Sequence, residues 1–167
     1  MIKRSAILVL SAVGIFLSGC GVSHMRIIKQ SASMAKPQEV SLVRVEVVSD
    51  RQGVDKEDLS TAWEKIAVDE LQSLLAQKLV KVRAGAQSTI VCRINVKFGN
   101  KALRYWVGFG AGKGSVDVVV EMKDANGQVI YATAAKANLS IGVFGGSMTA
   151  VVDGAIKSAV ADFGSRL

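Results

Sequence analysis

The sequence predicts an α+β fold, a two-layer sandwich in which a mostly antiparallel sheet of about four strands carries two helices on one face. Three observations lead to this prediction. From residue 39 onward, several segments alternate between apolar and polar residues, which is the pattern of half-buried strands. One amphipathic helical pattern interrupts these segments and a second follows them. An Asn-Gly pair between two alternating segments is a strong signal for an antiparallel hairpin.

The chain begins with the layout of a secretory signal. Lys3 and Arg4 precede an apolar run at residues 6–17, which is too short to cross a bilayer as a helix. The run ends in Leu17-Ser18-Gly19-Cys20, which resembles a bacterial lipobox. This resemblance implies a signal peptide at residues 1–19 and a mature chain that starts at Cys20 and carries several acyl chains such as palmitate. Several acyl chains make a stable membrane anchor.

Residues 20–38 are expected to form a flexible, lipid-anchored tether, because they hold the only Pro and show no sustained hydrophobic period. Gly21, not Asp, follows the lipobox. By the precedent of bacterial lipoproteins, this implies sorting to the outer membrane, facing the periplasm, in an organism with two membranes. Residues 39–167 then form a single folded domain.

The first strand is expected over residues 40–49, where Val43, Val45 and Val47 alternate with Arg44 and Glu46. After a polar turn at residues 50–58, apolar residues recur at spacings of three and four, as in an amphipathic helix: Leu59, Ala62, Trp63, Ile66, Ala67, Leu71, Leu74, Leu75 and Leu79. A short edge strand is expected at residues 80–83.

Two alternating segments, at residues 89–98 and 116–122, predict the next strands. Asp124-Ala125-Asn126-Gly127 predicts a hairpin turn, and the returning strand is expected from residue 128 to about residue 141. A last helix follows, capped by Ser147 or Thr149, with its apolar residues from Val152 to Phe163 on one face.

The residue types argue against the common catalytic and metal sites. The only His, His24, lies in the expected tether, so a Ser-His-Asp or Cys-His nucleophile is not available in the domain. Cys92 has no His or Cys companion there and is predicted to be a small core residue. The glycines of residues 108–115 do not match a phosphate loop, because Gly114 follows Lys113 instead of preceding it. We expect no enzymatic activity, no metal and no cofactor.

The formal charge of +7 is a poor guide to partners. All 14 acidic residues but only 16 of the 21 basic residues lie in residues 39–167, since the other five precede that domain. The domain is therefore nearly neutral, and the total charge does not indicate nucleic acid.

The charge is nevertheless uneven, because no Asp or Glu occurs between Leu71 and Val116. Arg93 and Lys97 are expected on the outward face of one strand, and further basic and aromatic residues follow. Such a combination suits an anion-binding or protein-binding surface. The alternative is a solvated band that pairs with the acidic residues before it. The candidate partner-binding residues, which we call the basic band, are Arg93, Lys97, Lys101, Arg104, Tyr105, Trp106 and Lys113.

Several short motifs occur in a recognisable order: Phe98-Gly99, Arg104-Tyr105, the glycines of residues 108–112, the turn at residues 124–127 and Phe144-Gly145-Gly146. With the lipobox, they resemble a family of uncharacterised bacterial lipoproteins, domain of unknown function 4410, over roughly residues 40–165. The resemblance implies a lipid-anchored envelope protein without an established activity, and it supplies no catalytic residues.

These observations favour a non-enzymatic binding or structural module, anchored by Cys20, that contacts an envelope protein or an anionic envelope polymer. The alternative is an accessory subunit of an envelope assembly or secretion machine that oligomerises through strand edges and the Tyr105-Trp106 region. A hydrolase of envelope polymers comes third. It would need a cleft with two carboxylates, whereas Asp117, Glu121 and Asp124 are predicted to be solvated strand and turn positions.

Overall fold

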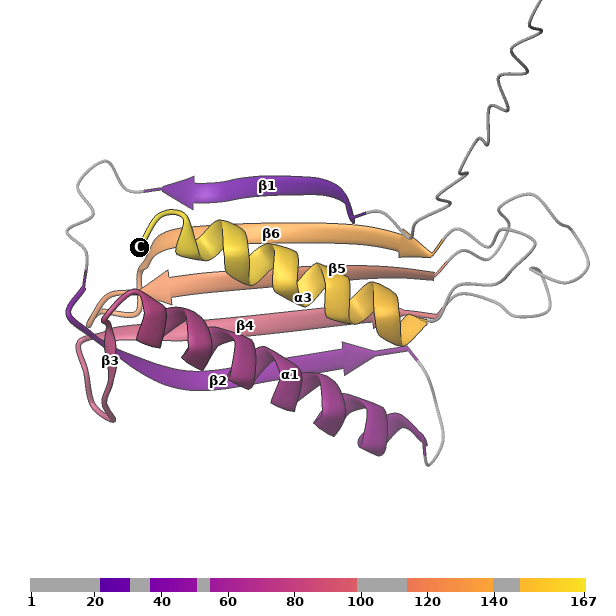
Figure 1. Ribbon diagram of the computed structural model, residues 1–167, viewed down its shortest axis with the longest axis horizontal. Coiled ribbons are helices and arrows are strands. Elements are labelled where there is room, and N and C mark those ends of the chain that lie inside the picture. The colour runs from indigo at the N-terminus through magenta and orange to yellow at the C-terminus, as the bar shows by residue number, and fades with distance from the viewer. Residues whose placement is uncertain (1–21, 31–36, 51–54, 99–113, 140–147) are drawn as a thin grey trace, which may run out of the picture.

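The structure is a computed structural model, and it describes residues 22–30, 37–50, 55–98, 114–139 and 148–167. Both described helices lie on one side of a single sheet, which confirms the two predicted layers (Figure 1). Neither of these helices is long and apolar enough to cross a membrane. Along the chain the elements are β1 (Val22–Gln30), β2 (Glu39–Ser49), α1 (Asp55–Gln77), β3 (Lys81–Val82), β4 (Ser88–Lys97), β5 (Gly114–Lys123), β6 (Val129–Leu139) and α3 (Met148–Gly164).

The sheet is larger and more mixed than the predicted sheet of about four mostly antiparallel strands. It has six strands in the order β1-β6-β5-β4-β2-β3. β1, β6, β5 and β4 are antiparallel neighbours, whereas β2 runs parallel to both β4 and β3. α1 lies between β2 and β4 in the chain, and a parallel pair needs a crossover of this kind. Alternation identifies strands without giving their neighbours, so the prediction of the sheet was only roughly right in strand number and direction.

The structure also differs from the expected tether, because residues 22–30 form β1. β1 pairs antiparallel with β6, with Val22 opposite Ala137 and Gln30 opposite Tyr131. β6 is 11 residues long, and β1 provides hydrogen-bond partners along an edge that would otherwise be open. The register of β1 shifts twice, after Val22 and after Ile27. Register shifts of this kind interrupt the strict period of two of a regular strand.

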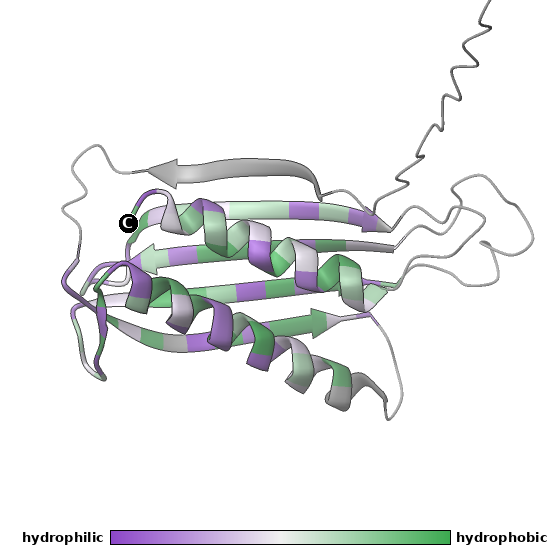
Figure 2. Cartoon of the chain, viewed as in Figure 1, coloured by the Kyte–Doolittle hydropathy of each residue, from purple (hydrophilic) through white to green (hydrophobic). Residues whose placement is uncertain are grey.

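The core lies between the sheet and the two helices. Along β4 and β5 apolar residues alternate with polar ones, and the inward residues are buried (Figure 2). The prediction for α1 is confirmed for most of its apolar face, but Ala62 and Leu79 are exposed. Cys92 is fully buried, as predicted. The largest fully buried side chains are Trp63, Tyr131, Phe163, Leu71, Leu75, Ile90, Ile94, Met122, Ile156, Val40, Val96 and Val116.

The predicted hairpin between β5 and β6 is confirmed. The Oδ1 atom of Asp124 accepts hydrogen bonds from the backbone N–H groups of Asn126, at 2.9 Å, and Gln128, at 2.8 Å. Gly127 has a φ of 76°, a left-handed conformation that Gly adopts without steric cost. The sequence Asp-Ala-Asn-Gly therefore supplies both the acceptor and the backbone freedom that this turn requires.

Two local details differ from the expected pattern. The register of β2 against β4 shifts between Leu42 and Arg44, so both Leu42 and Val45 pack toward the core. The side chain of Val43, predicted to face the core, lies outside the described residues. Thr149, one of the two predicted caps, is the second residue of α3. The other cap, Ser147, is likewise outside the described part.

α1 ends in a Schellman motif that has an unusual residue at its left-handed position. The N–H of Val80 donates to the carbonyl of Leu75, at 2.9 Å, and the N–H of Leu79 donates to the carbonyl of Ala76, at 3.1 Å. Leu79 has a φ of 57° and is 88% exposed. A left-handed conformation costs an L-residue with a Cβ roughly 1–2 kcal/mol, and Gly normally takes this position.

Replacing Leu79 with Gly is therefore expected to raise the free energy of unfolding by about 1 kcal/mol, as measured by urea denaturation. The variant Lys78→Gly is the matched control, because the preceding residue lacks a positive φ. It should lower the free energy of unfolding by about 0.5–1 kcal/mol. Equal destabilisation by both substitutions would contradict this account of the helix end.

Candidate functional site

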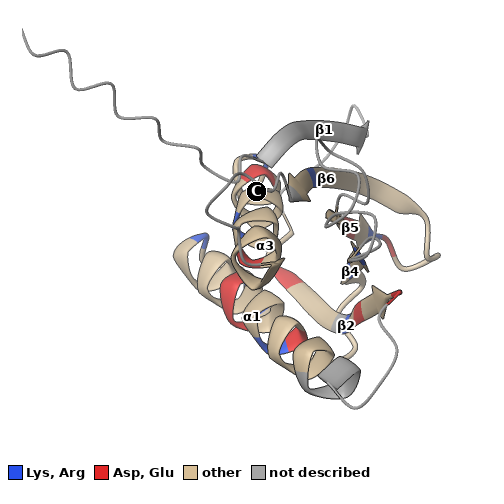
Figure 3. Ribbon diagram, turned by 90° about the vertical axis from the view of Figure 1, so that its right-hand side faces the viewer, with Lys and Arg blue, Asp and Glu red and all other residues tan. Residues whose placement is uncertain are grey.

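The face of the sheet opposite the helices is the candidate binding surface. Seen from the side, α1 and α3 cover only the other face (Figure 3). On β4 the inward side chains are buried, whereas Arg93, Asn95 and Lys97 are exposed. The predicted placement of Arg93 and Lys97 on one outward face therefore agrees with the structure. We call this side of the sheet the open face.

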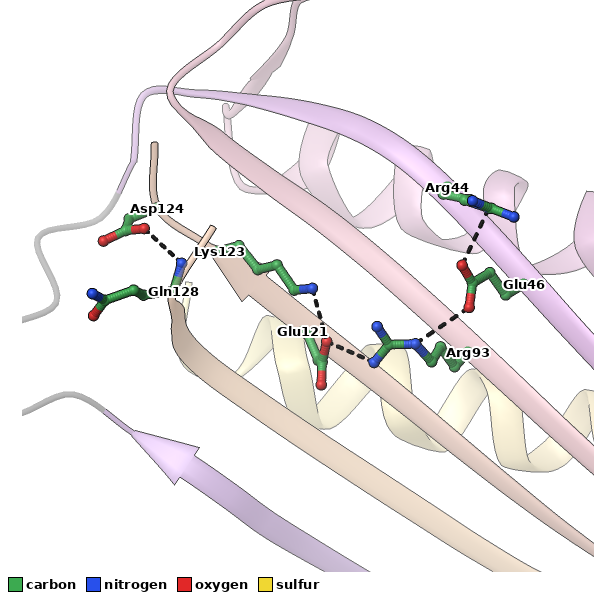
Figure 4. A network of polar contacts seen from close by, with 7 residues as sticks. All are labelled: Arg44, Glu46, Arg93, Glu121, Lys123, Asp124 and Gln128. Atoms are coloured by element: carbon green, nitrogen blue, oxygen red, sulfur yellow. Dashed lines mark hydrogen bonds and ion pairs between the residues drawn. The ribbon is translucent and has the colours of Figure 1, made fainter. Parts of the chain in front are cut away.

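A chain of ion pairs crosses three strands of the open face (Figure 4). Arg93, on β4, lies at its centre: its Nη1 is 2.8 Å from Oε2 of Glu121 on β5, and its Nε is 3.3 Å from Oε2 of Glu46 on β2. Glu46 also contacts Arg44, with 3.2 Å between Oε1 and Nε. Glu121 also contacts Lys123, with 3.6 Å between Oε2 and Nζ. We call these five residues the ion-pair network.

Strand register brings the network together. Glu46 is directly opposite Arg93 across the parallel β2–β4 pair. On the other side Arg93 is opposite Val119, so Glu121 lies two residues farther along β5 on the same face. Sequence reasoning missed this pairing, because it placed Glu121 at a solvated position. Only the order and register of the strands could have revealed it.

The network changes the interpretation of Arg93. Two carboxylates hold its guanidinium, and the Glu121 side chain is only 16% exposed. For Arg93 the structure therefore shows the pairing with acids that the sequence offered as an alternative to a partner site. Lys97 lies farther along β4 on the same face, opposite Ser115, and has no ion pair within the described part of the chain.

The other predicted site residues fall outside the described residues: Cys20, Lys101, Arg104, Tyr105, Trp106 and Lys113. The residues that flank 99–113 are described, however. The N–H of Phe98 donates to Oδ1 of Asp50, at 2.8 Å, and its ring stacks with Trp63 at 6.1 Å between centroids. At the other flank, a Cβ on Gly114 would collide with the methyl end of Met148. Both flanking residues thus pack against the rest of the domain.

The described side chains that could act in catalysis or bind a metal are buried, paired with a neighbour or isolated from one another. Burial raises the pKa of the Cys92 thiol to about 12, so it stays protonated and is a poor nucleophile at neutral pH. Oδ1 of Asp117 is 3.6 Å from Nζ of Lys136, and Glu121 belongs to the ion-pair network. Asp124 shapes the hairpin. Among the described residues, no three His, Cys, Asp or Glu side chains are close enough together to hold a metal ion.

Comparison with known proteins gives one family and several solved structures. The family model described as Domain of unknown function (DUF4410) matches residues 28–143, which is more than half of the chain. No curated protein sequence matches.

The solved structures that resemble this chain are distant in sequence. The PelC dodecamer from Paraburkholderia phytofirmans has 16% identity and a TM-score of 0.53, with 83% of this chain and 96% of PelC covered. A single-residue variant of that PelC has 18% identity and a TM-score of 0.51, with 86% and 98% covered. A minor lipoprotein from Acinetobacter baumannii has 12% identity and a TM-score of only 0.38, with 77% and 91% covered. At such identities the likeness to PelC is one of fold alone.

The geometry of the network predicts energetic coupling between Arg93 and Glu121. In a double-mutant cycle with Arg93→Met and Glu121→Gln, measured by urea unfolding, the coupling should be about 0.5–1 kcal/mol at low salt. This coupling energy should be smaller in 1 M salt, because a Debye length of about 3 Å screens the attraction between partly exposed charges. The exposed pair Lys65–Asp69 on α1 is the control and should couple more weakly. Zero coupling at both salt concentrations would show that Arg93 is not held by Glu121.

Proposed function

The chain belongs to the family described as Domain of unknown function (DUF4410), and from this premise we propose that it is a lipid-anchored protein of the bacterial cell envelope. The observation that carries the proposal is the lipobox, in which Cys20 follows a basic and apolar signal sequence. Gly21 after the Cys favours the outer membrane, with the domain facing the periplasm.

The domain itself acts as a non-enzymatic binding module in this proposal. The acids of its open face are engaged in ion pairs, and its sequence after residue 39 contains no His for nucleophilic catalysis. The proposed contact surface is the basic band, in which Lys97 is an exposed cation on the open face. The partner is an envelope protein or an anionic envelope polymer, which a basic and aromatic surface can bind through charge and stacking.

The second candidate is an oligomeric subunit of an envelope assembly or secretion machine. Two observations favour it. The fold resembles that of PelC, which forms a dodecamer. In the described part of the chain, β3 pairs only with Glu39 and Val40, and residues 41–48 of β2 have no strand beside them on that edge. An open strand edge is a surface through which copies of a chain can associate.

The membrane anchor is tested by metabolic labelling with a palmitate analogue and by membrane fractionation of wild type and Cys20→Ala. We expect the wild type to carry the label and to fractionate with the outer membrane, since several acyl chains give a stable anchor. Cys20→Ala should lose the label and remain in the precursor form. Labelling of Cys20→Ala, or an unlabelled wild type, would refute the anchor.

The binding surface is tested by crosslinking in cells followed by capture of the protein. The double variant Lys97→Glu and Arg104→Glu should lose crosslinked partners, because it reverses two charges of the basic band. The variant Lys78→Glu and Lys81→Glu is the control, since it makes the same change in net charge at the end of α1 and at β3. Arg93 is left intact because a Glu there would face Glu46 and Glu121.

The crosslinked masses distinguish the two candidates. A product that contains a different protein or a polymer, and that the basic-band variant loses, supports the binding module. A ladder of multiples of this chain, equal in both variants, supports the oligomeric subunit. Unchanged heterologous partners in the basic-band variant would refute the proposed surface.

A further inference from the structure

β1 begins close to the proposed lipid anchor. Only Gly21 separates Cys20 from Val22, the first residue of β1. Consecutive Cα atoms are about 3.8 Å apart, so the Cα atoms of Cys20 and Val22 are at most about 7.6 Å apart. A flexible segment of eighteen residues would instead allow roughly 60 Å. The pairing of β1 with β6 therefore removes nearly all of the expected freedom between anchor and domain.

The same register identifies the part of the domain next to the anchor. Val22 is opposite Ala137 on β6, and Ala137 is opposite Val116 near the start of β5. α3 begins at this end as well, since Met148 lies against Gly114. We call this end of the sheet the anchored end: the start of β1, the end of β6, the start of β5, the first turn of α3 and the end of β4, where Lys97 lies opposite Ser115.

The hairpin between β5 and β6 lies at the opposite end of the strands (Figure 1). β5 is 10 residues long. With a rise of about 3.3 Å per residue, the tip of the hairpin is about 30 Å from the anchored end. Because the anchor lies at one end of the strands, that end of the domain is close to lipid and the hairpin is far from it.

We propose that the anchored end is held at the membrane surface, so that the domain stands with its hairpin pointing away from the bilayer. The proposal rests on the lipid anchor of the proposed function and adds the surface that contacts the membrane. Its partner is the head-group layer of the bilayer that holds the acyl chains of Cys20.

The other faces of the domain are less suited to this contact. The open face carries the ion-pair network, and pressing it onto a bilayer would remove water from charges that are partly exposed. The outer side of α1 exposes Glu64, Lys65 and Asp69. Within the described sheet β1 is an edge strand, and its outer side would bring a row of peptide groups toward lipid, where they lack hydrogen-bond partners.

The test places a small fluorophore at either end of the full-length lipoprotein. Thr149→Cys marks the anchored end and Ala125→Cys marks the hairpin tip, and both residues are exposed. Cys92 needs no replacement, because it is fully buried in the folded protein. The labelled proteins are purified from membranes and reconstituted in phosphatidylethanolamine–phosphatidylglycerol vesicles that contain a lipid with a nitroxide on its head group. Circular dichroism checks that both variants are folded.

We expect the nitroxide to quench the probe at residue 149 at least about three times as strongly as the probe at residue 125, because about 30 Å of strand separates them. Inserting ten Gly and Ser residues between Gly21 and Val22 should reduce quenching at residue 149 to the level at residue 125. Equal quenching at the two positions, or quenching unchanged by the insertion, would overturn the proposal. Mass spectrometry reports lipid on Cys20 separately: its absence overturns the anchor and the membrane contact together, whereas lipidated protein with equal quenching overturns the contact alone.

Discussion

The structure depends on one constraint, which is that the helices cover the sheet on a single face. Each inward residue of β4 and β5 must be apolar to pack under α1 and α3, and each outward residue must tolerate water. Alternation along the strands meets both requirements. It also places Arg93 of β4 among the side chains of β2 and β5, because neighbouring strands in register present their outward residues to one another.

The charged surface follows from the same constraint. The sequence separates acidic residues before Leu71 from basic residues after it, which suggests an unbalanced positive band. The sheet brings acids from both sides of this basic stretch to Arg93, since β2 carries Glu46 from before it to one side and β5 carries Glu121 from after it to the other. The positive character that remains on the described open face is therefore local, at positions such as Lys97, and is smaller than the sequence indicates.

Most individual elements could be predicted from the sequence, because the hydrophobic period is set by contacts within each segment. The helix of Trp63 and Leu71, the strand of Cys92 and the hairpin at Asp124 all follow from local patterns. The pairing of strands could not be predicted, because it depends on contacts between distant segments. This applies to the parallel β2–β4 pair, to β1 and to the partners of Arg93. Of the candidate site residues, only Arg93 and Lys97 lie in the described part of the chain, and register decided their different surroundings.

The pairing of β1 with β6 has a consequence for the order of folding. Val22 and Ala137 are neighbours in the sheet but lie more than 100 residues apart in the chain, so their contact closes a very long loop. Such closure loses more chain entropy than the turn at Asp124, which joins adjacent strands. The β5–β6 hairpin is thus expected to form early and to act as the template on which β1 docks late. β1 would then be the last strand to join the sheet.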